Sequence, residues 1–115
     1  MMIHIENFSN LMINISHSKS TILVWIELCD LFKQDGTFVF KQSALAKKLN
    51  MAKGTISKAI TLLKDLEAIH YDKETFEWYY NPFIMTVTGQ SDNQLAQLQD
   101  QWEDEIGHYV FHTKA

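Results

Sequence analysis

Six lysines fall within a short stretch of the chain that carries no acidic side chain. Between positions 41 and 64 the sequence has these six lysines and no aspartate or glutamate. They are Lys41, Lys47, Lys48, Lys53, Lys58 and Lys64. Lysine ammonium groups neutralise phosphates, and such contacts supply most of the sequence-independent affinity of proteins for nucleic acids. The stretch therefore indicates a phosphate-binding surface, although the chain as a whole has a formal net charge of −4.

Small polar residues lie among these lysines, at positions where they could reach a phosphate or a base edge. They are Gly54, Thr55, Ser57 and Thr61. Ile56, Ala59, Ile60, Leu63 and Leu66 recur at helical spacing, which predicts an amphipathic helix with the lysines and hydroxyls on its outer face. At the start of that helix, free backbone N–H groups and the positive end of the helix dipole favour a phosphate.

A second, shorter helix is predicted just before this one. Leu45, Ala46 and Leu49 make its inner stripe, and Asn50 can adopt the left-handed conformation that ends a helix. Residues 41–66 therefore read as a helix-turn-helix, in which the second helix enters the major groove of DNA. Because the chain contains no arginine, guanine recognition would fall to lysine, which predicts modest specificity and strongly salt-dependent affinity.

The flanking segments supply the other parts of a winged helix-turn-helix. Ser18 or Ser20 caps a largely apolar helix that runs to about Lys33, and residues 37–40 read as one strand. Residues 68–80 read as a β-hairpin, the wing, which brings Lys73 into the DNA-contacting set. Residues 6–12 form either a short helix or an extended lead-in, and residues 83–88 form a further extended piece. The expected fold is α+β, mostly helical: a winged helix-turn-helix with an added C-terminal helix.

The C-terminal part of the chain differs in composition from the rest. Acidic residues crowd it, and Ser91 or Asp92 would cap a helix whose apolar stripe is Leu95, Leu98, Trp102 and Ile106. We expect residues 1–89 to form the DNA-binding domain and residues 90–115 an acidic helix and tail. The stripe packs either on the domain's own first long helix or on a second subunit. We favour pairing with a second subunit, because a winged helix that binds a palindromic DNA site needs a dimer.

The span from Phe8 to Gly89 resembles the RepL type of plasmid replication protein. The resemblance rests on Ile15 to Ser20, on Leu45 to Ile69, and on Tyr80 to Ile84. It implies binding at a plasmid or phage origin and recruitment of replication proteins. The sequence departs from the usual pattern at Glu67, where such domains have a capping glycine, and at Ala52, where they have a serine or threonine cap.

Other functions are less well supported by the sequence. A transcriptional repressor is a close rival, and a protein-interaction module that uses the acidic helix or the aromatic hairpin is a third possibility. Phe76, Trp78, Tyr79 and Tyr80 could stack on single-stranded bases, although core packing and partner contact are favoured. His108 and His112 have i, i+4 spacing but no further ligand nearby, so no metal site is expected.

The sequence also lacks the patterns typical of other protein classes. It has no nucleophile-plus-base constellation, P-loop or dinucleotide fingerprint, so we expect neither an enzyme nor a cofactor. The single cysteine, Cys29, fits a core position in a reducing compartment. With no signal-like or membrane-spanning segment, a cytoplasmic location is expected.

Overall fold

The computed structural model describes residues 2–106, which form five helices and five short strands. The helices are α1 (Ile5–Ile15), α2 (Lys19–Cys29), α3 (Gln42–Leu49), α4 (Lys53–Asp65) and α5 (Asp92–Ile106). The strands are β1 (Met2–Ile3), β2 (Thr37–Phe38), β3 (Ile69–Asp72), β4 (Glu77–Tyr80) and β5 (Met85–Thr86). Within residues 2–106 this is the expected α+β arrangement, a winged helix-turn-helix followed by one further helix.

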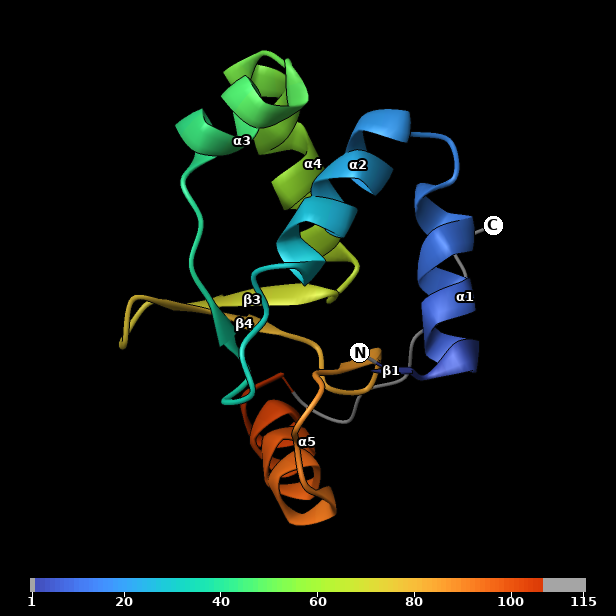
Figure 1. The fold of residues 1–115 in the computed structure, drawn as a ribbon, viewed down its shortest axis with the longest axis vertical. Coiled ribbons are helices and arrows are strands. Elements are labelled where there is room, and N and C mark those ends of the chain that lie inside the picture. Colours follow the sequence, from blue (N-terminus) through green and yellow to red (C-terminus); the bar gives the residue numbers. More distant parts are fainter. Residues whose placement is uncertain (1, 107–115) are drawn as a thin grey trace.

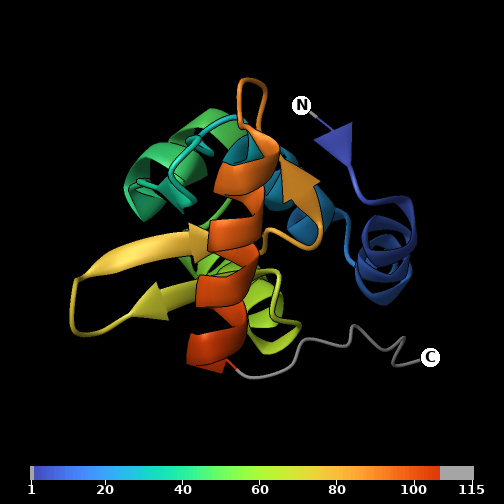
Figure 2. The same ribbon diagram turned by 90° about the horizontal axis from the view of Figure 1, so that it is seen from below.

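A three-stranded antiparallel sheet separates the helices into two layers. Its strand order is β2-β4-β3, and β3 and β4 form the wing hairpin with Ile69 opposite Tyr80 and Asp72 opposite Glu77. In Figure 1, α2 and α4 lie above this sheet and α5 lies below it. The view from below in Figure 2 shows α5 crossing the hairpin on the face away from α4. The acidic helix is thus separated from α4 by the sheet.

The core forms where α2 meets α4 and the sheet. Val24, Trp25 and Leu28 of α2 are at most 1% exposed, as expected for a helix that is apolar over most of its circumference. Ser18 caps α2 by accepting a hydrogen bond from the Thr21 N–H at 3.2 Å. Beyond the helix, Phe32 stacks on Tyr80 with ring centroids 4.2 Å apart. This stack fixes the end of α2 against the wing.

Several predicted boundaries need adjustment. The ambiguous segment 6–12 is helical, as part of α1. The α2 helix ends at Cys29 rather than near Lys33, because the next turns use i→i−3 bonds such as Leu31 N–H to Leu28 C=O. The strand expected over 37–40 is confined to Thr37 and Phe38. The extended piece at 83–88 contains β5, which pairs with β1 at the other end of the chain.

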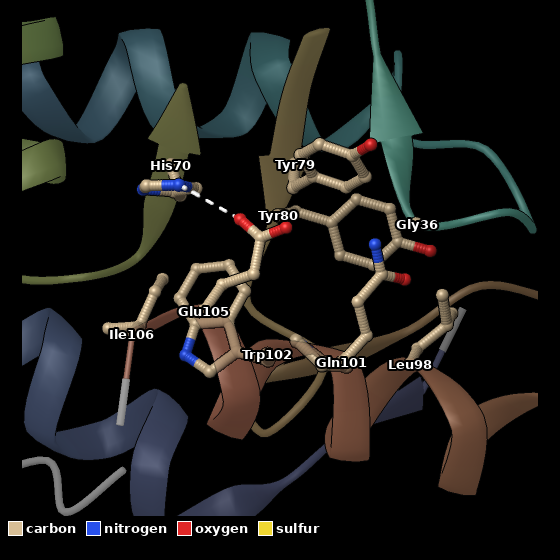
Figure 3. Close-up of a pocket in the computed structure, with 10 residues that line it drawn as sticks. Gly36, His70, Tyr79, Tyr80, Leu98, Gln101, Trp102, Glu105 and Ile106 are labelled. Atoms are coloured by element: carbon tan, nitrogen blue, oxygen red, sulfur yellow. Dashed lines mark ion pairs between the residues drawn. The ribbon is translucent and has the colours of Figure 1, made fainter. Parts of the chain in front are cut away.

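The stripe on α5 packs against its own chain. Trp102 is 4% exposed and lies edge-on to His70 of β3, with centroids 6.2 Å apart (Figure 3). Glu105 faces His70 at 3.5 Å. Leu98 packs on the turn at Gly36, whose φ is +90°; a Cβ there would lie 2.8 Å from a Leu98 methyl. The contact is with the sheet, not with α2.

The sequence predicts subunit pairing through the stripe of Leu95, Leu98, Trp102 and Ile106. Because Trp102 is buried within its own chain, it is not available for such a contact. Pairing through the exposed edge of α5 stays a prediction. The division into residues 1–89 and 90–115 also stays a prediction, although Trp102 belongs to the same core as the preceding residues.

Candidate nucleic-acid interface

The turn between α3 and α4 is built as the sequence predicts. Asn50 has φ +54° and ψ +50°, the left-handed conformation that stops α3. The Met51 N–H then donates to the Ala46 carbonyl at 2.9 Å and closes the turn. Ala46 and Ala59 are both buried, so small side chains allow the two helices to approach closely. This turn fixes the angle between α3 and α4.

The outer face of α4 presents the polar residues singled out from the sequence. Lys53, Gly54, Ser57, Lys58, Thr61 and Lys64 are exposed, and Thr55 is half-buried. The opposite face is buried through Ile56, Ile60 and Leu63. The helix carries no acid before Asp65 at its last position. This face is therefore cationic along nearly its whole length.

The first turn of α4 is left open for a ligand. The side chain at its N-cap, Ala52, has no capping atom, and its carbonyl accepts from the Thr55 and Ile56 N–H groups. Among the described residues, no hydrogen-bond partner is recorded for the backbone N–H of Lys53 or Gly54. A Cβ at Gly54 would meet nothing within 4 Å. An oxyanion could therefore come close to the backbone here.

The predicted DNA-contacting lysines are not equivalent in the structure. Lys41 is exposed just before α3, and Lys47 is exposed on α3. Lys48 instead forms an ion pair with Glu27 of α2 at 2.7 Å, and this hydrogen bond raises the pKa of Lys48. The Lys64 ammonium lies 5.8 Å from the centroid of the Trp78 ring. Lys53 and Lys58 have no such partner among the described residues.

The tip of the wing carries Lys73, the DNA contact predicted for the hairpin, among acidic residues. Lys73 is exposed there, but Asp72, Glu74 and Glu77 surround it in the sequence. The Glu74 N–H donates to Asp72 at 2.8 Å and holds the pKa of Asp72 below its usual value. The hairpin aromatics divide between inside and outside: Tyr80 is buried and Phe76 is 76% exposed. Trp78 and Tyr79 are half-buried, so three of the four rings lie in packing contacts and one lies outside.

One buried polar residue that the sequence did not single out positions the wing relative to α4. Asn81 is fully buried; its amide donates to the Glu67 carbonyl and its oxygen accepts from the Phe83 N–H, both at 2.8 Å. Glu67, just beyond α4, has φ +59°, the conformation that favours glycine. The Asn-Pro pair at positions 81 and 82, which is typical of a turn, is the sequence signal for this role of Asn81.

The described residues contain no group of three or more His, Cys, Asp or Glu side chains able to hold a metal ion. No helix among them is long and apolar enough to cross a membrane. His108 and His112, the pair with i, i+4 spacing, lie outside the described residues.

Comparison with known families supports the class that this geometry defines. Residues 18–69, from the cap of α2 to the first residue of β3, match the family model of a helix-turn-helix domain. With the hairpin that follows, the fold is a winged helix-turn-helix. Searches of curated proteins and of solved structures found no match to the chain.

Proposed function

We propose that this protein binds double-stranded DNA by placing the exposed face of α4 in the major groove. The observation that carries the proposal is the acid-free face of α4, where Lys53 and Lys58 flank an uncapped first turn with an open glycine. Phosphates suit the lysines and the free N–H groups, while Thr55 and Ser57 can reach base edges. A binding protein without enzymatic activity or cofactor is part of this proposal.

One hydrogen bond refines which of these side chains reads bases. The Ser57 hydroxyl donates to the Gln42 side chain of α3 at 3.1 Å. Ser57 is thereby held toward α3, and Gln42 extends the polar surface next to it. Thr55 and Thr61 keep hydroxyls with no recorded partner among the described residues, so we assign base-edge contacts to them first.

The test is duplex binding across a salt series, with two variants that remove one lysine each. Lys58→Gln removes an ammonium from the α4 face, and its matched control Lys33→Gln removes one from the exposed loop after α2. Each phosphate that the protein neutralises contributes about −0.9 to the slope of log affinity against log salt, because counterions are released from the DNA. We expect Lys58→Gln to flatten the slope by about 0.9 and Lys33→Gln to leave it unchanged. Equal slopes for all three proteins would contradict the proposal.

The proposed DNA binding would serve one of two biological roles. Origin binding in plasmid or phage replication rests on the resemblance of Phe8 to Gly89 to RepL-type proteins, and transcriptional repression is the alternative. Footprinting on the DNA that carries the gene separates them: protection over origin repeats supports replication, and protection over a promoter supports repression. A failure to bind any duplex at low salt would instead favour a protein-interaction module on a winged-helix scaffold.

A further inference from the structure

The wing tip holds an aromatic ring in solvent in a way that costs conformational energy. Phe76 is 76% exposed and has φ +60°, a conformation that aromatic residues rarely adopt. Its N–H donates to the Asp72 carbonyl at 2.8 Å, which locks the turn. Both ribbon views show this hairpin turn extending beyond the helices (Figures 1 and 2). An exposed aromatic side chain on a projecting turn is typical of a contact surface.

The charges beside this ring argue against DNA as its contact. Asp72, Glu74 and Glu77 give the tip three carboxylates against the single ammonium of Lys73. Bringing this tip to a phosphate backbone would place like charges together. A partner for the tip should therefore offer an apolar recess with a cationic rim.

The chain itself has such a recess beside α3. An open groove of about 290 Å³ lies between the end of α2, the segment after β2, and α3. Its apolar lining includes Leu31, Val39, Phe40 and Leu45, of which Val39 is 68% exposed. Lys41, Lys48 and Glu27 also line the groove, and Glu27 pairs with Lys48 at 2.7 Å, so Lys41 supplies the positive charge of the rim. No residue of α4 takes part, so an occupant would leave the proposed DNA-binding face free.

We propose that the wing tip docks on a second copy of this chain, with Phe76 entering the α2–α3 groove and the tip carboxylates facing Lys41. The exposed phenyl ring matches the apolar lining of the groove, and the acidic tip matches the charge of Lys41. The hairpin turn and the segment leading into α3 lie toward the same side of the molecule in Figure 1, as a two-fold contact that uses both surfaces of each copy requires. This contact would assign Lys41 to self-association and not to DNA.

The experiment measures mass in the absence of DNA, so its result does not depend on the proposed function. Sedimentation of the wild type over a concentration series should show a monomer–dimer equilibrium. Phe76→Asn removes the ring but keeps a residue that tolerates positive φ, so the fold should persist. We expect its dimer to dissociate about tenfold more readily or more, the effect of losing one buried apolar side chain. Ile5→Asn, at a 74% exposed position on α1, is the control and should dimerise as the wild type does.

A charge-exchange pair tests the orientation of the contact. Lys41→Glu and Glu74→Lys should each weaken the dimer, and the double variant should recover association, because each reversed charge then meets its opposite. A wild type that is monomeric at every concentration would overturn the proposal, as would a dimer that Phe76→Asn leaves unchanged. A Phe76→Asn variant with unaltered mass but weakened duplex binding would place the tip on DNA instead.

Discussion

Asn81 offers a sharp test of how the wing is attached to the helix-turn-helix. Its amide group makes two hydrogen bonds of 2.8 Å in a fully buried position, one to the Glu67 carbonyl and one from the Phe83 N–H. Asn81→Ala removes both hydrogen bonds. With about 1 kcal/mol net for each bond, we expect a loss of about 2 kcal/mol. That is a large share of a typical domain stability.

Urea unfolding followed by tryptophan fluorescence measures this loss, with the exposed Asn93→Ala as control. Asn81→Asp adds a pH test, because it keeps the acceptor for Phe83 but sets an oxygen against the Glu67 carbonyl. Burial should raise the pKa of the new carboxyl above its unfolded value, so the protonated form favours the folded state. Asn81→Asp should then lose less stability at pH 4 than at pH 7. An Asn81→Ala loss below about 0.5 kcal/mol, no larger than that of a typical surface substitution, would refute this reasoning.

Three further predictions follow from single residues. Glu67→Gly should stabilise the protein by about 0.5–1 kcal/mol in the same urea assay, because glycine adopts φ +59° without the steric cost of a side chain; a destabilised variant would contradict this. Burial raises the pKa of the Cys29 thiol to about 12, so alkylation at pH 8 should be slow in the native state and fast in urea, and a native rate equal to that of a free thiol would be incompatible with the packing. Trp102→Ala should lower the free energy of unfolding by about 3 kcal/mol at unchanged oligomeric mass, since Trp102 packs within its own chain; a variant of lower mass and unaltered stability would restore the pairing role of α5.

The helix-turn-helix was the part of the fold most accessible from sequence, because its signals are local. The spacing of Ile56, Ile60 and Leu63 defines the buried face of α4, and Asn50 marks the end of α3 by its tolerance of the left-handed conformation. The exposed face of α4 follows from the same periodicity. These features depend on neighbours within one or two helical turns.

The long-range features were not accessible in the same way. Pairing of β1 with β5 joins residues more than eighty positions apart, and neither strand has an alternating pattern long enough to reveal it. The ion pair between Glu27 and Lys48 depends on how α2 meets α3. The apolar stripe of α5 was visible in the sequence, but the sequence does not show which surface the stripe packs on. In the structure it packs on the sheet, where Gly36 leaves room for Leu98.

The DNA contact assigned to Lys73 stays a prediction. The acidic residues around it, Asp72, Glu74 and Glu77, are visible in the sequence, whereas the exposure of Phe76 depends on a turn in which that residue has positive φ.

The most direct test of the central claim is a duplex titration of the ¹⁵N-labelled protein followed by amide chemical shifts. The account predicts that the earliest and largest changes occur at Lys53, Gly54 and Thr55, where the first turn of α4 is open, with little change along α5. Changes centred on α5, or no change at any amide at low salt, would contradict DNA binding through α4.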